Sequence, residues 1–124
     1  MQRRGLNLLR PETDEQEMVD FDQRQYRLML DRLVAFDEGR IRLDTLVDDL
    51  EGLLNILAEP DPAWKRTFLG FWGELEEERA YALFKEIKAF DEETTQSLRA
   101  KVAELEQLVR QKIDHRAHLD EDTD

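Results

Sequence analysis

The sequence contains no cysteine, and this absence excludes disulfide bonds, thiol nucleophiles, thiolate zinc sites and iron–sulfur clusters. It also lacks any apolar run near the roughly 20 residues that a membrane-spanning helix needs, so we expect no membrane segment. Close to the amino terminus, Arg10 and Pro11 interrupt the leucines too early for a signal peptide. These absences predict a cytoplasmic protein.

Residues that break helices are also scarce, since the 124 residues include only five glycines and three prolines. Leucine, glutamate, arginine and alanine are plentiful, and all four favour helix. The hydrophobic fraction of 40% is higher than in most disordered chains. Length and composition together predict an all-α fold, a single-domain bundle of about four helices with antiparallel neighbours.

Local signals predict where the first helix lies. We expect residues 1–14 to form a flexible N-terminal arm that Pro11 closes. Asp14 has the side chain of a helix N-cap, so the helical domain should begin at residue 15 and extend to residue 116. Gly39 follows the first predicted helix, 15–37, as glycine often does just past a helix end. Residues 117–124 are predicted to be an acidic disordered tail.

The remaining helices have boundary signals of the same kind. Asp44 is the predicted cap of the second helix, which Pro60 stops. Asp61, followed by proline, is a strong start for a third helix that should extend to about residue 90. Asp91 is the predicted cap of a fourth helix, from residue 92 to about residue 116.

Helical periodicity marks the core. Trp64, Phe68 and Trp72 recur every four residues along the third helix, and we expect them to be buried, with Leu83 and Ile87 further along the same side. Gly70 and Gly73 lie inside this helix and each weakens it by roughly 1 kcal/mol. Either the close approach of a neighbouring backbone or a kink would explain them. The second helix contributes one continuous stripe, which consists of Leu43, Leu46, Val47, Leu50, Leu53, Leu54 and Leu57.

The apolar stripe of the fourth helix is narrower. Leu98, Val102, Leu105 and Val109 recur at a spacing close to a heptad repeat. This pattern leaves two interpretations open, a helix at the edge of the bundle or a helix that pairs with a second copy of itself.

Negative charge is the most marked feature that is present. The formal net charge is −12, and residues 44–61 contain no lysine or arginine. This acidic stretch is either a solvated helix face or a docking surface for a basic protein, and it disfavours nucleic acid and anionic membranes. If the second and third helices pack antiparallel, the acidic residues of both come to one level. The candidate contact residues are Asp48, Asp49, Glu51, Asn55, Glu74, Glu77, Glu78 and Tyr81.

The sequence contains no clear catalytic, nucleotide-binding or metal-binding motif. We expect Glu76 and Arg79 to form a structural ion pair, and no motif supplies a nucleotide site or a matched catalytic pair. His115 and His118 lie one helical turn apart, but at the end of a helix before an acidic tail, which indicates no metal site. We therefore predict no catalytic residue, no metal and no cofactor. Dispersed basic residues also argue against direct nucleic-acid binding.

Residues 33–90 resemble a family of small helical bacterial proteins, the immunity proteins of contact-dependent growth inhibition and other polymorphic toxin systems. The resemblance is carried by Gly39-Arg40-Ile41, Leu46-Val47, Asp49-Leu50-Glu51, Leu53-Leu54-Asn55, Trp64-Lys65, Phe68, Phe71-Trp72, Leu75-Glu76 and Tyr81-Ala82. It implies a cytoplasmic, non-enzymatic protein that neutralises a toxin domain, frequently a basic nuclease, by covering its active site or a neighbouring exosite.

The leading hypothesis is therefore an immunity or inhibitor protein, a monomer or weak dimer, that binds a basic toxin domain through an acidic helical surface. One alternative is a scaffold or regulator that dimerises through the fourth helix. Another is a DNA-mimicking inhibitor that uses the same acidic surface and competes directly with DNA.

Overall fold

The computed structural model describes residues 2–113, with side chains from residue 15 onward. Within this range the chain is all-α and contains no strand, as the composition predicts. The predicted tail, 117–124, and the pair His115 and His118 lie outside the described residues. The helices are α1 (Gln2–Asp37), α2 (Leu43–Asn55), α3 (Pro62–Phe84) and α4 (Glu92–Lys112).

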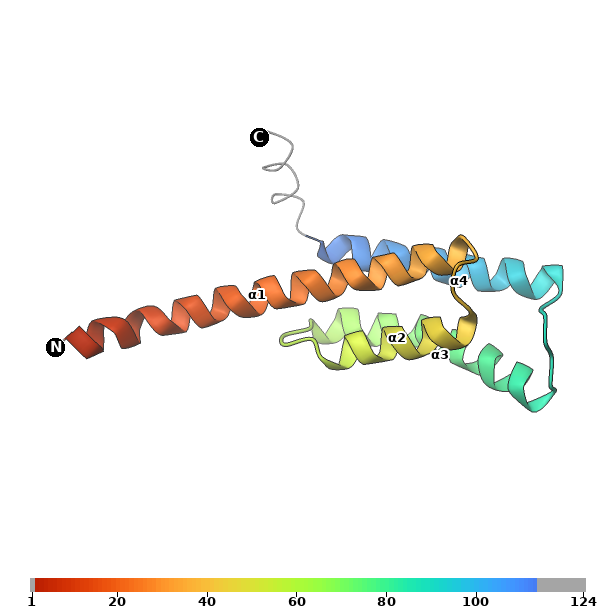
Figure 1. Ribbon diagram of the computed structural model, residues 1–124, viewed down its shortest axis with the longest axis horizontal. Helices are drawn as coiled ribbons and strands as arrows, with labels where there is room; N and C mark the ends of the chain where they lie inside the picture. Colours follow the sequence, from red (N-terminus) through yellow and green to blue (C-terminus); the bar gives the residue numbers. More distant parts are fainter. Residues whose placement is uncertain (1, 114–124) are drawn as a thin grey trace, which may run out of the picture.

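Each helix packs against two others, so that α1 contacts α2 and α4, and α3 contacts the same two helices. Consecutive helices run in opposite directions, and the first turns of α1 project beyond the rest of the bundle (Figure 1). Side-chain contacts agree with this arrangement, because Gln23 of α1 donates a 2.6 Å hydrogen bond to the last carbonyl of α4, at Lys112. The predicted bundle with antiparallel neighbours is confirmed.

The core lies between the four helices and contains the predicted stripes of α2 and α4. Trp64 and Phe68 are buried, and Trp72 packs at the edge of the core. No helix within residues 2–113 is both long and apolar enough to cross a membrane. The largest fully buried side chains are Phe68, Met29, Leu33, Leu46, Leu50, Leu75, Leu98 and Leu105.

Two predicted caps are confirmed. The Asp61 carboxylate accepts a 2.9 Å hydrogen bond from the Trp64 amide at the start of α3. The Asp91 carboxylate accepts one of 2.7 Å from the Thr94 amide at the start of α4, and this bond lowers the pKa of Asp91. Both bonds satisfy amide groups that have no partner within their own helix.

The predicted start of the first helix is wrong. α1 begins at Gln2 and not at residue 15, so Asp14 lies inside the helix and is not its N-cap. Residues 2–10 consist largely of glutamine, arginine and leucine, which are good helix formers. Extending an existing helix adds one hydrogen bond for each residue fixed, so the packed part of α1 can propagate towards its amino end.

The predicted cap of the second helix is also wrong. The N-cap position of α2 is Arg42, which makes no side-chain capping bond, and Asp44 lies in the first turn. Leu43, the first residue of α2, is buried. The burial of Leu43 thus accompanies a helix start one residue before the predicted cap.

The third helix ends earlier than expected, at Phe84 and not near residue 90. Glu86 adopts a left-handed backbone with φ of 56°, and the Ile87 amide donates to the Ala82 carbonyl over 2.8 Å, which closes the helix. Leu83 and Ile87 are exposed, so their predicted place in the core is wrong. α4 likewise ends at Lys112, four residues short of the prediction, because Ile113 is extended.

The glycines of α3 have no crowded neighbour. A Cβ atom added to Gly70 or Gly73 would meet nothing within 4 Å. The suggestion that a neighbouring backbone of the same chain comes close to them is therefore wrong, and both are open positions on the helix surface.

The apolar stripe of α4 is used inside the chain. Leu98, Val102, Leu105 and Val109 are at most 1% exposed, because α4 packs against both α1 and α3. The seam that suggested self-pairing of this helix is therefore already covered by its own chain.

Candidate partner-binding surface

The outer face of α2 follows from its amphipathic sequence. The leucine stripe turns inward, and Asp48, Glu51 and Asn55 are left exposed on the opposite side. Among the described residues, neither Asp48 nor Glu51 forms an ion pair within 4.0 Å. These three residues form what we call the α2 outer face.

Asp49 points to a different neighbour. Its carboxylate lies 3.8 Å from the guanidinium of Arg32 on α1, in a groove between α1 and α2 that Asp48 also lines. The charge of Asp49 is therefore offset by a cation from another helix. It contributes less to a negative surface than Asp48 or Glu51, although the three are close in sequence.

Glu74 also lies beside a cation. Its carboxylate is 3.9 Å from Nζ of Lys101 on α4, so this side of α3 faces α4. Glu78 follows Glu74 by one helical turn, whereas Glu77 and Tyr81, which lie four residues apart, are exposed on the outward side of α3. The eight predicted residues are thus divided among the α2 outer face, the groove between α1 and α2, and the outer and α4-facing sides of α3.

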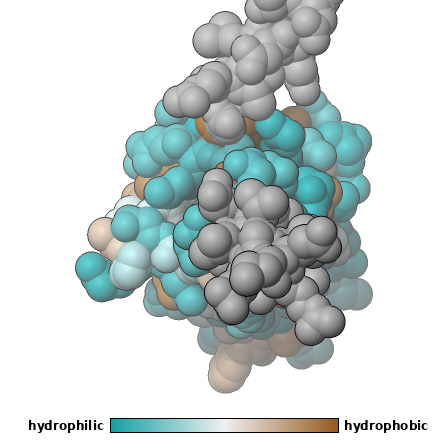
Figure 2. Space-filling model, turned by 90° about the vertical axis from the view of Figure 1, so that its left-hand side faces the viewer, coloured by the Kyte–Doolittle hydropathy of each residue, from teal (hydrophilic) through white to brown (hydrophobic). Residues whose placement is uncertain are grey.

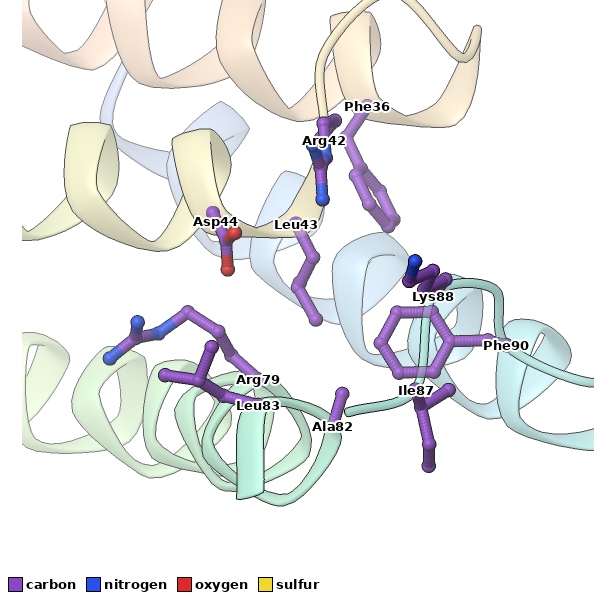
Figure 3. Close-up of a pocket in the computed structure, with 10 residues that line it drawn as sticks. All are labelled: Phe36, Arg42, Leu43, Asp44, Arg79, Ala82, Leu83, Ile87, Lys88 and Phe90. Carbon is purple, nitrogen blue, oxygen red and sulfur yellow. The ribbon is translucent and has the colours of Figure 1, made fainter. Parts of the chain in front are cut away.

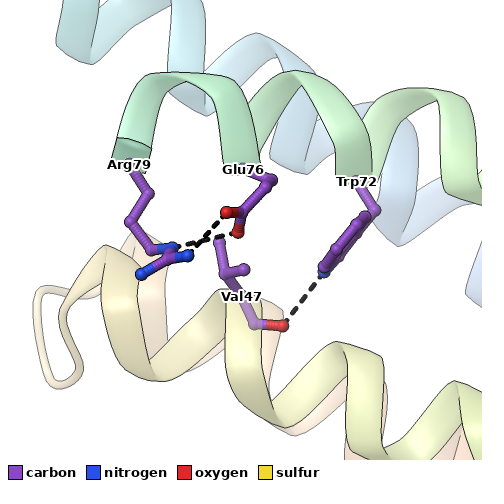
Figure 4. A network of polar contacts seen from close by, with 4 residues as sticks. All are labelled: Val47, Trp72, Glu76 and Arg79. Atoms are coloured by element: carbon purple, nitrogen blue, oxygen red, sulfur yellow. Dashed lines mark hydrogen bonds and ion pairs between the residues drawn. The ribbon is translucent and has the colours of Figure 1, made fainter. Parts of the chain in front are cut away.

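The contact between α2 and α3 contains a cation too (Figure 4). Nε of Arg79 donates a 3.0 Å hydrogen bond to Glu76, which confirms the predicted ion pair. Beside it, the Trp72 indole donates a 3.0 Å hydrogen bond to the Val47 carbonyl of α2. The bond to Glu76 raises the pKa of Arg79, and the charge of Asp48 raises it further.

An exposed apolar surface lies at the end of α3, where the sequence predicted a contact only for Tyr81. Phe84 is 75% exposed, Leu83 70% and Tyr81 56%, and Ile87 follows in the link to α4. We call these four residues the α3 end patch. At the other end of the bundle, the surface that Figure 2 draws in colour is mostly hydrophilic. The early end of α3 takes Ile87 out of the predicted core stripe, whereas Leu83 lies within α3 beside the buried Ala82 and is exposed on the helix surface.

A cavity of about 300 Å³ opens beside this patch (Figure 3). Leu43 and Phe90 lie on two sides of it, and the side chains of Arg42 and Lys88 lie at its rim. Within the described residues neither of these two cations forms an ion pair. The remaining lining residues are Phe36, Asp44, Arg79, Ala82, Leu83 and Ile87.

No cluster of His, Asp or Glu in the described part of the chain could hold a metal ion. Comparison of the chain with family models, curated proteins and solved structures gives no match. The features of this chain that bear on its function are therefore the arrangement of charge and of apolar surface on the bundle.

Proposed function

We propose that the chain is a non-enzymatic immunity or inhibitor protein that binds a basic protein partner, of the toxin-domain kind, through the α2 outer face. In this proposal the protein acts in the cytoplasm, where the toxin would reach its target. It needs no cofactor, because inhibition follows from covering the partner's surface.

The observation that carries the proposal is that some of the acidic residues form ion pairs within the chain and others do not. Arg32 offsets Asp49 and Lys101 offsets Glu74, whereas Asp48 and Glu51 have no cation within 4.0 Å among the described residues. A basic partner can therefore approach Asp48 and Glu51 without displacing an existing ion pair.

The net charge of −12 supports the same proposal, because a strongly negative protein attracts a basic partner over long distances and accelerates binding at low salt. The resemblance of residues 33–90 to immunity proteins adds a partner class that fits this charge. Asn55, at the end of the same face, is a hydrogen-bonding group beside the two carboxylates.

The test partner is the product of the reading frame next to the gene for this chain, which the proposal expects to contain a toxin domain. Co-expression of the two should protect cells, and surface plasmon resonance should show an association rate that falls steeply with salt. Replacing Asp48 and Glu51 by lysine should slow association roughly tenfold or more at low salt and flatten the salt dependence.

The matched control changes the same charge elsewhere. Asp31 on α1 and Glu104 on α4 are also exposed, so Asp31→Lys with Glu104→Lys alters net charge equally. If this control slows association as much as the α2 double variant, only the overall charge matters and the assignment to α2 is wrong. Absence of protection would contradict the inhibitor function itself. Competition with DNA for the partner would favour the DNA-mimic alternative.

A further inference from the structure

The α3 end patch is more apolar surface than isolated exposed residues would explain. Phe84 and Tyr81 lie three residues apart on the same outward side of α3, and both are more than half exposed. Contiguous exposed aromatic residues on a helix mark a surface that another molecule covers. This surface lies on α3 and is distinct from the α2 outer face.

Along α3, a negative residue precedes these aromatic residues and a positive residue follows them. Glu77 precedes Tyr81 by four residues, and Lys85 follows it by four. Among the described residues neither Glu77 nor Lys85 forms an ion pair. The Lys85 ammonium instead lies 5.6 Å from the centre of the Phe84 ring, next to the apolar surface.

When two copies of α3 pack antiparallel, this order of charges in one copy is complementary to the same order in the other. When two copies of the same helix pack about a two-fold axis at Tyr81, each residue four positions before the axis meets the residue four positions after it in the other copy. Glu77 of each copy then faces Lys85 of the other, about 6 Å along the helix from the axis. Both ion pairs form at once, with Tyr81 and Phe84 of the two copies between them.

We propose that the occupant of this surface is a second copy of the chain, and that the last turns of α3 form an antiparallel, two-fold dimer contact. The apolar side chains at its centre exclude water, and the pairs between Glu77 and Lys85 set the register at the rim. The contact leaves Asp48 and Glu51 free for a different partner. Net repulsion between two chains of charge −12 keeps the dimer weak at low salt.

Sedimentation velocity over a concentration series tests the proposal with the full chain. Wild-type protein should show a dimer fraction that rises with concentration. Phe84→Asp should raise the dimer dissociation constant at least about tenfold, because it places a charge in the apolar centre. Phe84 is exposed, so this variant should fold, and circular dichroism checks that it does.

Charge reversal makes the test specific for the register. Glu77→Lys and Lys85→Glu alone should each weaken the dimer about threefold to tenfold, since each places like charges opposite one another. An equimolar mixture of the two variants should dimerise at least as well as wild type, because every facing pair is then of opposite sign. Glu104→Lys on α4 is the control and should leave the association constant within about twofold.

Three results would overturn the proposal. They are a wild-type chain that stays monomeric at every concentration, a Phe84→Asp variant that associates as wild type does, and a mixture that dimerises no better than either charge variant alone. A monomeric wild type would leave the α2 assignment untouched, because that assignment is measured against the toxin domain. The α3 end patch would then belong to a contact with a different protein.

Discussion

Asp22 of α1 holds the link between α2 and α3 through the backbone of Ala58. Its carboxylate accepts a 2.7 Å hydrogen bond from the Ala58 amide and a 3.0 Å hydrogen bond from the Glu59 amide. Asp22 is only 7% exposed, although Ala58 and Glu59 are themselves exposed residues. A side chain at the middle of one helix thus fixes the turn between two others, and with it the level at which α2 meets α3.

Removal of this carboxylate should destabilise the fold. Asp22→Ala leaves two amide groups without their charged acceptor, and we expect the free energy of unfolding to fall by about 2–3 kcal/mol. Asp22→Asn keeps one acceptor oxygen and should lose less. Urea unfolding measures both values. Asp20→Ala is the control, because among the described residues its exposed carboxylate accepts from Gln16 alone, and it should change stability by less than about 0.5 kcal/mol.

The open glycines of α3 predict a gain in stability. Gly70→Ala and Gly73→Ala should each raise the free energy of unfolding by about 0.5–1 kcal/mol, because alanine favours helix and nothing lies within 4 Å of the added Cβ. Gly39→Ala should have the opposite effect, since Gly39 has φ of +77° where a Cβ is strained. Thermal unfolding of the three variants measures these changes in stability. A loss of stability in Gly70→Ala would contradict the prediction and indicate a neighbour on that face of α3.

Trp64 of α3 contacts both α1 and α4, and its indole should contribute more to the free energy of unfolding than the indole of Trp72 does. Nε1 of Trp64 donates a 2.8 Å hydrogen bond to the Leu108 carbonyl of α4, and its ring meets Tyr26 of α1 edge-on at 5.4 Å. Trp64→Phe should cost about 2–3 kcal/mol through the lost hydrogen bond and lost packing. Trp72→Phe, at a half-buried site, should cost about 1 kcal/mol less in the same urea experiment. Equal losses would contradict this ranking.

Stability should depend on pH through Glu106. Burial, followed by a hydrogen bond with Asp37 and then by the charge of Asp37, raises the pKa of Glu106 to about 7, and the Glu106 side chain is only 16% exposed. Between the ordinary pKa of about 4.5 and the folded value, the folded state binds more protons than the unfolded state, so the free energy of unfolding falls as pH rises.

The matching variant is Glu106→Gln, which cannot ionise. It should be more stable than wild type at pH 8 by at least about 1 kcal/mol, and this difference should shrink towards pH 4. Urea unfolding across this pH range provides the measurement. Glu104→Gln, on the exposed side of α4, should show no such trend. A constant difference between Glu106→Gln and wild type at all pH values would show that the raised pKa is not the cause.

Local patterns were sufficient for features that depend on one helix. The spacing of Leu46, Leu50 and Leu54 identified the buried side of α2, and the side chains of Asp61 and Asp91 identified two helix starts. Each depends on neighbours within four residues, which the sequence contains explicitly. The helix start at Gln2 could not be predicted from local patterns, because Pro11 and Asp14 are typical of a helix stop and a helix cap. Both residues lie inside α1, since extending an existing helix costs less than starting a new one.

The candidate site was predictable only in part, for the same reason. The acidic residues of α2 are visible in the sequence, but their cations come from other helices, Arg32 from α1 and Lys101 from α4. Which carboxylate meets which cation depends on how each helix is rotated in the bundle, and a one-residue rotation of about 100° changes every such pair.

The sequence by itself determined the all-α class, the inward sides of α2 and α4, two of the caps and the excess of negative charge. Tertiary packing decided that Asp49 and Glu74 form ion pairs with other helices whereas, among the described residues, Asp48 and Glu51 do not, and that Leu83 and Phe84 face solvent. Periodicity reports the orientation of side chains within one helix, whereas charge pairing and exposure depend on the distance between helices that are far apart in the chain.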